Sequence, residues 1–188
     1  MYPDPAIENS PQRSGVGGSV VQKKVCMVGA PATGKTSLVQ RFVKSIFSER
    51  YHSTVGVRIE RKEVDADGTP VNLVLWDIEG QERFQSVQTS YLRGAGGLIF
   101  VVDGTRGETL EQLASMREQA HGAVGDVPCA VALNKADLAA SWALTPEQER
   151  ALGAAFPHVL KTSAKTGAGV EAMFGWLAAA MLKAPAGA

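Results

Sequence analysis

A short glycine-containing segment restricts the possible folds of this chain more strongly than its composition does. The segment is Gly29-Ala30-Pro31-Ala32-Thr33-Gly34-Lys35-Thr36, which fits the pattern G-x-x-x-x-G-K-[ST]. It lies between an apolar run that ends at Val28 and a helix-like stretch from Lys35 to about Ile46. Glycines let a backbone wrap closely around a phosphate chain, and the N–H groups at a helix start attract anions. An ordinary glycine-rich turn is disfavoured by this strand-and-helix context, and we predict a phosphate-binding loop.

This loop and the turn that follows it are expected to hold the phosphates of a nucleotide. Lys35 adds a positive charge at the outer phosphates, which makes it a catalytic as well as a binding residue. The Thr36 hydroxyl is a hard oxygen ligand suited to Mg²⁺. The residues assigned to nucleotide binding here are Ala32, Thr33, Gly34, Lys35, Thr36 and Ser37.

A second candidate segment, Trp76-Asp77-Ile78-Glu79-Gly80-Gln81-Glu82, follows a strand-like stretch. A carboxylate at the end of a buried strand is costly unless it is paired or near a metal, so we expect Asp77 to hold the Mg²⁺ shell through water. Gly80 would let a backbone N–H approach a terminal phosphate, and Gln81 would orient the attacking water. Alone, this pattern also fits an ordinary strand end, and it gains its meaning from the upstream loop.

Two further segments predict recognition of a base. In Asn134-Lys135-Ala136-Asp137, the Asp137 carboxylate can accept hydrogen bonds from adjacent N–H and NH₂ donors, which guanine has and adenine lacks. The alkyl part of Lys135 can lie over the purine plane. In Thr162-Ser163-Ala164-Lys165, the small Ala164 would let a backbone N–H reach guanine O6. Either segment alone could be an ordinary loop, but in series with the first two they favour a guanine nucleotide.

The remaining pattern alternates apolar runs with helix-like stretches. Asp67-Gly68 predicts a hairpin between strands at 57–64 and 71–76, and the apolar run Leu98–Val102 is typical of a strand buried on both faces. Thr145, followed by Pro146 and Gln148, predicts a capped helix start. We expect an α/β fold of the P-loop NTPase type: a mostly parallel six-stranded sheet with one antiparallel edge strand and helices on both faces. Other elements are expected at 109–124, 127–133, 158–161 and 170–182.

Length and composition exclude several classes of protein. The chain has 188 residues, which predicts one domain, here 23–183, between a flexible tail at 1–22 and a short tail at 184–188. Because 19 basic residues balance 19 acidic ones, we expect no nucleic-acid partner. No apolar run approaches the ~20 residues that a membrane span needs. Cys26 and Cys129 are expected to be reduced core thiols, which favours a cytoplasmic location.

Taken in order, the four segments resemble those of Ras-superfamily small GTPases, and the resemblance covers about 23–183. The segment 51–57 and Trp76-Asp77 are most similar to the Rab-like branch. The resemblance implies a small G domain that binds GTP or GDP with Mg²⁺ and hydrolyses GTP slowly as a molecular switch. It implies activator, exchange-factor and effector partners and a monomeric chain. Its site residues would include Phe47 against the guanine, Tyr51 over the phosphates, Thr54 on Mg²⁺, Gly80 and Gln81 in the second switch, and Asn134, Lys135, Asp137, Ser163, Ala164 and Lys165 around the base.

The chain departs from the family pattern at three places. Pro31 stands where most members have glycine, and Ile78-Glu79 replaces the usual Thr-Ala. The C-terminal residues contain no cysteine or polybasic stretch, so no lipid anchor is evident, and the Ala- and Gly-rich sequence suggests a prokaryotic member. Pro31 and Glu79 motivate an alternative hypothesis, a guanine-nucleotide-binding interaction module with little or no hydrolysis. A third hypothesis is an ATP-dependent P-loop enzyme.

Overall fold

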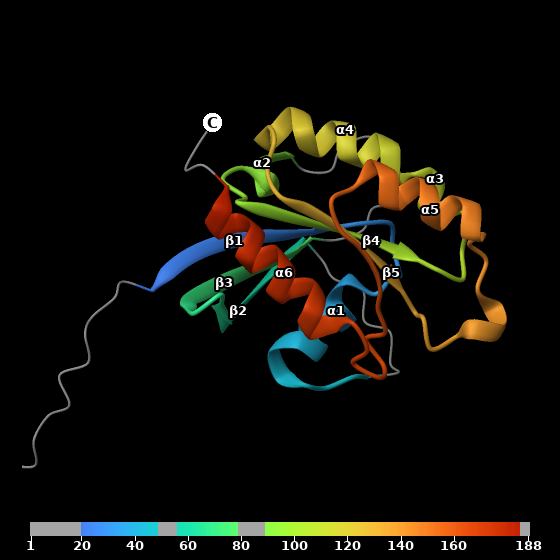
Figure 1. The fold of residues 1–188 in the computed structure, drawn as a ribbon, viewed down its shortest axis with the longest axis horizontal. Coiled ribbons are helices and arrows are strands. Elements are labelled where there is room, and N and C mark those ends of the chain that lie inside the picture. Colours follow the sequence, from blue (N-terminus) through green and yellow to red (C-terminus); the bar gives the residue numbers. More distant parts are fainter. Residues whose placement is uncertain (1–19, 49–55, 79–88, 185–188) are drawn as a thin grey trace, which may run out of the picture.

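The computed structural model describes residues 20–48, 56–78 and 89–184, and these form one twisted sheet covered by helices (Figure 1). Six strands lie in the order β2-β3-β1-β4-β5-β6. β2 is antiparallel to β3, and the other neighbouring pairs are parallel. The sheet therefore confirms the predicted mostly parallel arrangement with an antiparallel edge strand. The strands are β1 Val21–Val28, β2 Val57–Ala66, β3 Thr69–Ile78, β4 Gly97–Asp103, β5 Cys129–Asn134 and β6 Val159–Lys161.

Helices cover both faces of this sheet. One face carries α1 and α6, and the other carries α2, α4 and α5 (Figure 1). The helical segments are α1 Lys35–Lys44, α2 Thr89–Leu92, α3 Glu108–Glu111, α4 Leu113–Val124, the 3-10 turn η1 Ala139–Ser141, α5 Pro146–Ala155 and α6 Val170–Lys183.

Each face of the sheet has its own hydrophobic core, because successive side chains of a strand point to opposite faces. Against α1 and α6, the rings of Phe42 and Phe174 stack with centroids 4.0 Å apart. On the other face, Phe100 of β4 meets Phe156 edge to face at 5.9 Å. All residues of β4 are buried, as the apolar run Leu98–Val102 predicts for a central strand.

Local sequence signals account for some element boundaries and not for others. The Thr145 hydroxyl accepts a hydrogen bond from the Gln148 N–H, while the Gln148 side chain accepts one from the Thr145 N–H, so the predicted capping box is present.

The prediction of one continuous helix at 109–124 is wrong, because Gln112 separates α3 from α4. The Thr109 hydroxyl accepts the Asp103 N–H over 3.0 Å, which ties α3 to the end of β4 before the chain continues as α4. β1 begins at Val21, within the segment expected to be a tail.

Both cysteines are free thiols within the fold. Cys26 is fully buried and Cys129 is half-buried. Burial raises the pKa of Cys26 to about 12 and also raises the pKa of Cys129. A thiol with a raised pKa forms little of the reactive thiolate at neutral pH. In the described residues these side chains thus act as packing groups, as predicted.

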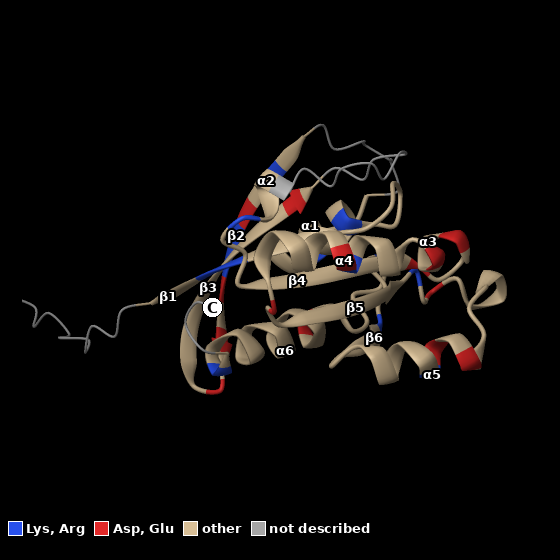
Figure 2. Ribbon diagram, turned by 90° about the horizontal axis from the view of Figure 1, so that it is seen from above, with Lys and Arg blue, Asp and Glu red and all other residues tan. Residues whose placement is uncertain are grey.

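Charges of both signs are interspersed over the described part of the chain (Figure 2). The edge strand β2 shows this clearly, because Glu60 pairs with Lys44 over 2.7 Å and Lys62 pairs with Glu171 over 2.8 Å. Charged residues on an edge strand hinder its pairing with another chain. Across residues 20–48, 56–78 and 89–184, no helix has the length and apolar character that crossing a bilayer requires.

Candidate active site

The predicted phosphate loop, residues 29–36, leaves the carboxyl end of β1 near the middle of the sheet. Because β1 pairs with β3 on one side and β4 on the other, chain connections run in opposite directions from this strand. Ligands of open α/β sheets bind at such a switch point, outside the carboxyl ends of the strands. The ends of β3, β4 and β5 place Asp77, Asp103 and Asn134 along the same edge.

Lys35 is enclosed by the loop that precedes it. Its side chain is buried, and its Nζ donates hydrogen bonds to the carbonyl oxygens of Gly29 over 2.8 Å and Ala30 over 2.9 Å. The Thr33 hydroxyl donates to the same Ala30 oxygen over 3.0 Å. Ala32 has φ 59°, a left-handed conformation that is uncommon for a residue with a Cβ. The loop therefore curls around a fixed positive charge, as binding of a phosphate chain requires.

Gly34 joins the loop to α1 in a position that only glycine suits. Its φ is 97°, and a Cβ there would overlap the Asn134 side-chain amide. That amide donates a hydrogen bond to the Thr33 carbonyl oxygen over 2.9 Å. The phosphate loop and the predicted base segment are thus in direct contact through a buried side chain.

Thr36 and Asp77 lie together at the start of α1 and the end of β3. The Thr36 hydroxyl donates to Asp77 Oδ2 over 2.6 Å, and the Asp77 side chain is fully buried. A hydroxyl and a carboxylate are the hard oxygen donors that Mg²⁺ prefers. This donor set fits the predicted magnesium ion. The third expected ligand, Thr54, lies outside the described residues.

The two predicted base segments are held together by Asn134 and Ser163. Asn134 Oδ1 accepts from the Thr162 hydroxyl and the Ala164 N–H, both over 3.3 Å. The Ser163 hydroxyl donates to Asp137 Oδ1 over 2.6 Å and so orients the exposed carboxylate. In this structure the Ala164 N–H expected at guanine O6 donates to a protein oxygen, in a bond that is long for an N–H donor.

A buried charge cluster that the sequence reasoning missed lies beside the loop. Asp103, at the end of β4, is fully buried, and its Oδ2 accepts from Lys135 Nζ over 2.7 Å and Arg106 Nε over 2.8 Å. Burial by itself would raise the pKa of Asp103, but the hydrogen bonds from Lys135, Thr105 and Arg106 outweigh it and hold that pKa below its usual value. The argument applied to Asp77, a carboxylate at the end of a buried strand, would have found Asp103.

Arg106 extends this cluster to the phosphate loop. Its Nη2 donates a hydrogen bond to the Pro31 carbonyl oxygen over 2.7 Å. Pro31 is the residue at which the chain departs from the usual glycine. The side chain that holds the loop at this point thus comes from the turn after β4, far away in the sequence.

Most of the predicted site residues fall in the part of the chain that the structure describes. Ser37 lies in the first turn of α1, and Lys165 is exposed in the loop before α6. Phe47 is half-buried and packs against the core beneath α1 and α6. The expected residues Tyr51, Thr54, Gly80 and Gln81 lie outside the described residues.

Comparison with known proteins gives a consistent set of relatives. The sequence model of the Ras family matches residues 24–183, a range that includes all four segments. "Ras-related protein Rab-13" of Canis lupus familiaris is 34% identical over 159 residues, which is 82% of this chain and 77% of the relative. "Ras-related protein Rab-1" of Theileria parva is 34% identical over 161 residues, 84% of this chain and 73% of the relative. "Ras-related protein RABD1" of Arabidopsis thaliana is 33% identical over 154 residues, 80% and 75% respectively.

Proposed function

Because this chain belongs to the Ras family and is a small GTPase that binds guanine nucleotides and hydrolyses GTP as a switch, we propose that the loop between β1 and α1 carries the reaction. The observation that carries this proposal is the position of Lys35, whose buried Nζ is held by the Gly29 and Ala30 carbonyls. An amine fixed there needs little reorganisation when charge develops on a transferring phosphoryl group.

The phosphate side of the site depends on charge and positioning rather than covalent chemistry. The Lys35 charge would face the outer phosphates, while the amides of the loop and of the first turn of α1 would bind their oxygens. Thr36 and Asp77 would hold the magnesium ion, which neutralises phosphate charge when bound. Gln81 is expected to orient the attacking water and Thr54 to complete the metal shell, and both roles stay predictions. We expect the isolated protein to hydrolyse GTP slowly.

The base side of the site favours guanine over adenine. Asp137, oriented by Ser163, would accept hydrogen bonds from the N1–H and 2-amino groups of guanine. Asn134 and the Ala164 N–H would lie beside the opposite edge of the base. A bound base would cover the Asp137 carboxylate, and a covered carboxylate that meets no donor costs free energy, which is why adenine would be rejected.

The setting of the protein follows from family and surface. As a Ras-family member the chain has regulator and effector partners in general, here proposed to be an activator, an exchange factor and effectors. The free thiols of Cys26 and Cys129 support a cytoplasmic location. The charged edge strand β2 supports a monomer, which size-exclusion chromatography with light scattering would test.

Two other hypotheses are less well supported. A module without hydrolysis, suggested by Pro31 and Glu79, is not favoured by membership in a family of GTPases. An ATP-dependent enzyme is not supported by the guanine recognition proposed for Asp137, which Ser163 orients.

One experiment separates these possibilities. Single-turnover phosphate release from γ-labelled GTP and ATP should show hydrolysis of GTP only, and Thr36→Ala should slow it because a metal ligand is removed. Lys44→Ala, a change on the same helix outside the site, should leave the rate unchanged. Equal release from GTP and ATP, or no release from GTP above the protein-free control, would reject the proposal. Asp137→Asn should lose the preference for GTP in competition binding.

A further inference from the structure

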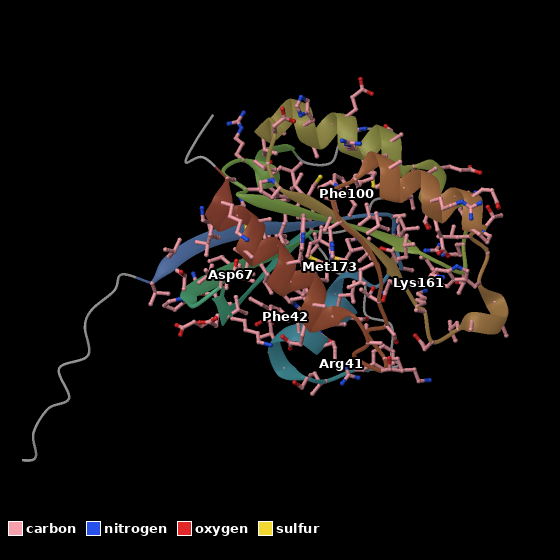
Figure 3. The ribbon with its side chains drawn as sticks, viewed as in Figure 1. Arg41, Phe42, Asp67, Phe100, Lys161 and Met173 are labelled. Atoms are coloured by element: carbon pink, nitrogen blue, oxygen red, sulfur yellow. The ribbon has the colours of Figure 1, made fainter. Side chains whose placement is uncertain are left out.

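Arg41 connects the last turn of α1 to the loop between β6 and α6. Figure 3 shows it at the edge of the molecule where these two segments meet. Its Nε donates a hydrogen bond to the Ala164 carbonyl oxygen over 2.7 Å, and its Nη2 donates to the Lys165 carbonyl oxygen. Its Nη1 donates to the Ser45 carbonyl oxygen over 3.2 Å, where α1 ends. One guanidinium therefore binds two consecutive peptides of the base loop and the end of the phosphate-binding helix.

The contacts of Arg41 complement the backbone contacts of the same loop. The Ala164 N–H belongs to a planar peptide whose other end is the Ser163 carbonyl. That carbonyl accepts a hydrogen bond from the Gly167 N–H over 2.8 Å, and a Cβ on Gly167 would lie 3.7 Å from Arg41 Cδ. The loop thus fixes the peptide before Ala164, and Arg41 fixes the two that follow it.

We propose that Arg41 is a positioning residue for guanine recognition, because it sets the direction of the Ala164 N–H toward the O6 atom of the base. The proposal rests on the guanine recognition proposed above. In the structure this N–H donates to Asn134 Oδ1 over 3.3 Å, a bond long enough for sharing with a second acceptor. Without Arg41, the carbonyl oxygens of Ala164 and Lys165 lose the hydrogen bonds that its guanidinium donates. The segment that follows the Ala164 N–H is then less restrained, so the N–H can shift relative to the base even though the Gly167 contact remains.

The planar fork of arginine is what this position uses. Three separate N–H groups reach three carbonyl oxygens that belong to different peptides. A lysine at this position would carry the same charge, but its ammonium group is a single point and cannot reproduce the fork. Arg41→Lys should therefore retain part of the effect of Arg41, whereas Arg41→Ala should lose all of it.

The test compares GTP with 2-aminopurine riboside triphosphate, a nucleotide that lacks both O6 and the N1–H of guanine and keeps the 2-amino group. Affinities for the full-length protein are measured by displacement of a fluorescent GDP. We expect Arg41→Ala to weaken GTP about tenfold, which corresponds to about 1.4 kcal/mol. Its affinity for the O6-lacking nucleotide should change less than about twofold, because the contact that Arg41 orients is absent. Arg41→Lys should give an intermediate, equally selective loss.

Lys44→Ala is the matched control, because it removes a positive charge from the same turn of α1 and Lys44 pairs with Glu60 instead of the loop. It should leave both affinities unchanged. An equal loss for both nucleotides in Arg41→Ala and Arg41→Lys would show a general structural role and overturn the inference, as would no loss for GTP. If the wild-type protein itself fails to prefer GTP over the O6-lacking nucleotide, the base contacts proposed for Ala164 and for Asp137 with N1–H are wrong, which is a failure of the proposed guanine recognition and not of Arg41 alone.

Discussion

The guanidinium of Arg106 donates a hydrogen bond to the Pro31 carbonyl oxygen over 2.7 Å and so joins the turn after β4 to the phosphate loop. The same side chain is held by Asp103 through a 2.8 Å ion pair. Proline lacks an N–H group and fixes φ, so the loop at this point has fewer ways to be held by its own backbone. Arg106 supplies a contact from outside the loop.

Replacement of Arg106 by alanine should loosen the phosphate loop. The Pro31 carbonyl loses a charged donor. Because the Arg106 side chain is partly solvated, we expect the free energy of unfolding to fall by about 1–2 kcal/mol. We expect dissociation of a fluorescent GDP to accelerate several-fold and thermal unfolding to occur at a lower temperature. Arg150→Ala, which removes an exposed arginine paired with Glu147, is the control and should change neither measurement. Unchanged dissociation in Arg106→Ala would count against this role.

Replacement of Asp103 by asparagine should destabilise the fold in a pH-dependent way. It leaves Arg106 and Lys135 without their buried carboxylate. Because these two side chains are 36% and 33% exposed, water can solvate them in part, and we expect the free energy of unfolding to fall by about 2–3 kcal/mol, less than for a fully buried pair. The pKa of Asp103 is lowered in the folded state, so the stabilisation is complete above the unfolded pKa of about 3.9 and is lost as the pH falls through the folded value.

Urea unfolding at several pH values would measure this difference. The gap between wild type and Asp103→Asn should be constant from pH 7 to about pH 5 and shrink below about pH 4. A gap that is absent at pH 7, or that widens on acidification, would contradict the assignment.

Replacement of Ala32 by glycine should stabilise the protein. Ala32 has φ 59°, which costs an alanine about 1 kcal/mol and a glycine almost nothing. Glycine also makes the unfolded chain more flexible, which offsets part of this difference. The net increase in the free energy of unfolding should be about 0.5 kcal/mol. Ala140→Gly, on the exposed turn η1 where φ is not positive, should instead lower the free energy of unfolding. The two variants therefore differ in sign, and chemical denaturation would show whether they do.

Replacement of Thr145 by alanine should weaken the start of α5. The hydroxyl accepts the Gln148 N–H in a capping box, and its loss should cost about 1 kcal/mol of unfolding free energy. Thr145→Ser keeps the acceptor and should retain most of the stability. GTP affinity should not change, because α5 supplies none of the proposed nucleotide contacts. A serine variant as unstable as the alanine one would mean that the cap is not what stabilises this helix.

The sequence predicts residues whose role depends on near neighbours better than those whose role depends on the tertiary fold. The positions of Lys35 and Thr36 could be predicted because the spacing of the loop residues determines them. The structure brings Thr36 to Asp77 because the loop before Thr36 follows β1 and Asp77 lies at the end of the neighbouring strand β3. Arg106 and Arg41 could not be assigned this way. Their partners, Pro31 and Ala164, lie far away in the sequence and are backbone carbonyls, which leave no trace in residue type. The break at Gln112 was missed because the apolar spacing continues across it.

The ion pairs of Asp103 also connect the two segments of the proposed nucleotide site. Through Arg106 this carboxylate holds the loop expected at the phosphates, and through Lys135 it holds the segment expected at the base. The two segments of the proposed site are therefore connected through one buried carboxylate. A ligand that contacts both segments must span the separation that Asp103 holds between them, so we expect a free base or a bare triphosphate to contact one segment and bind more weakly than a whole nucleotide.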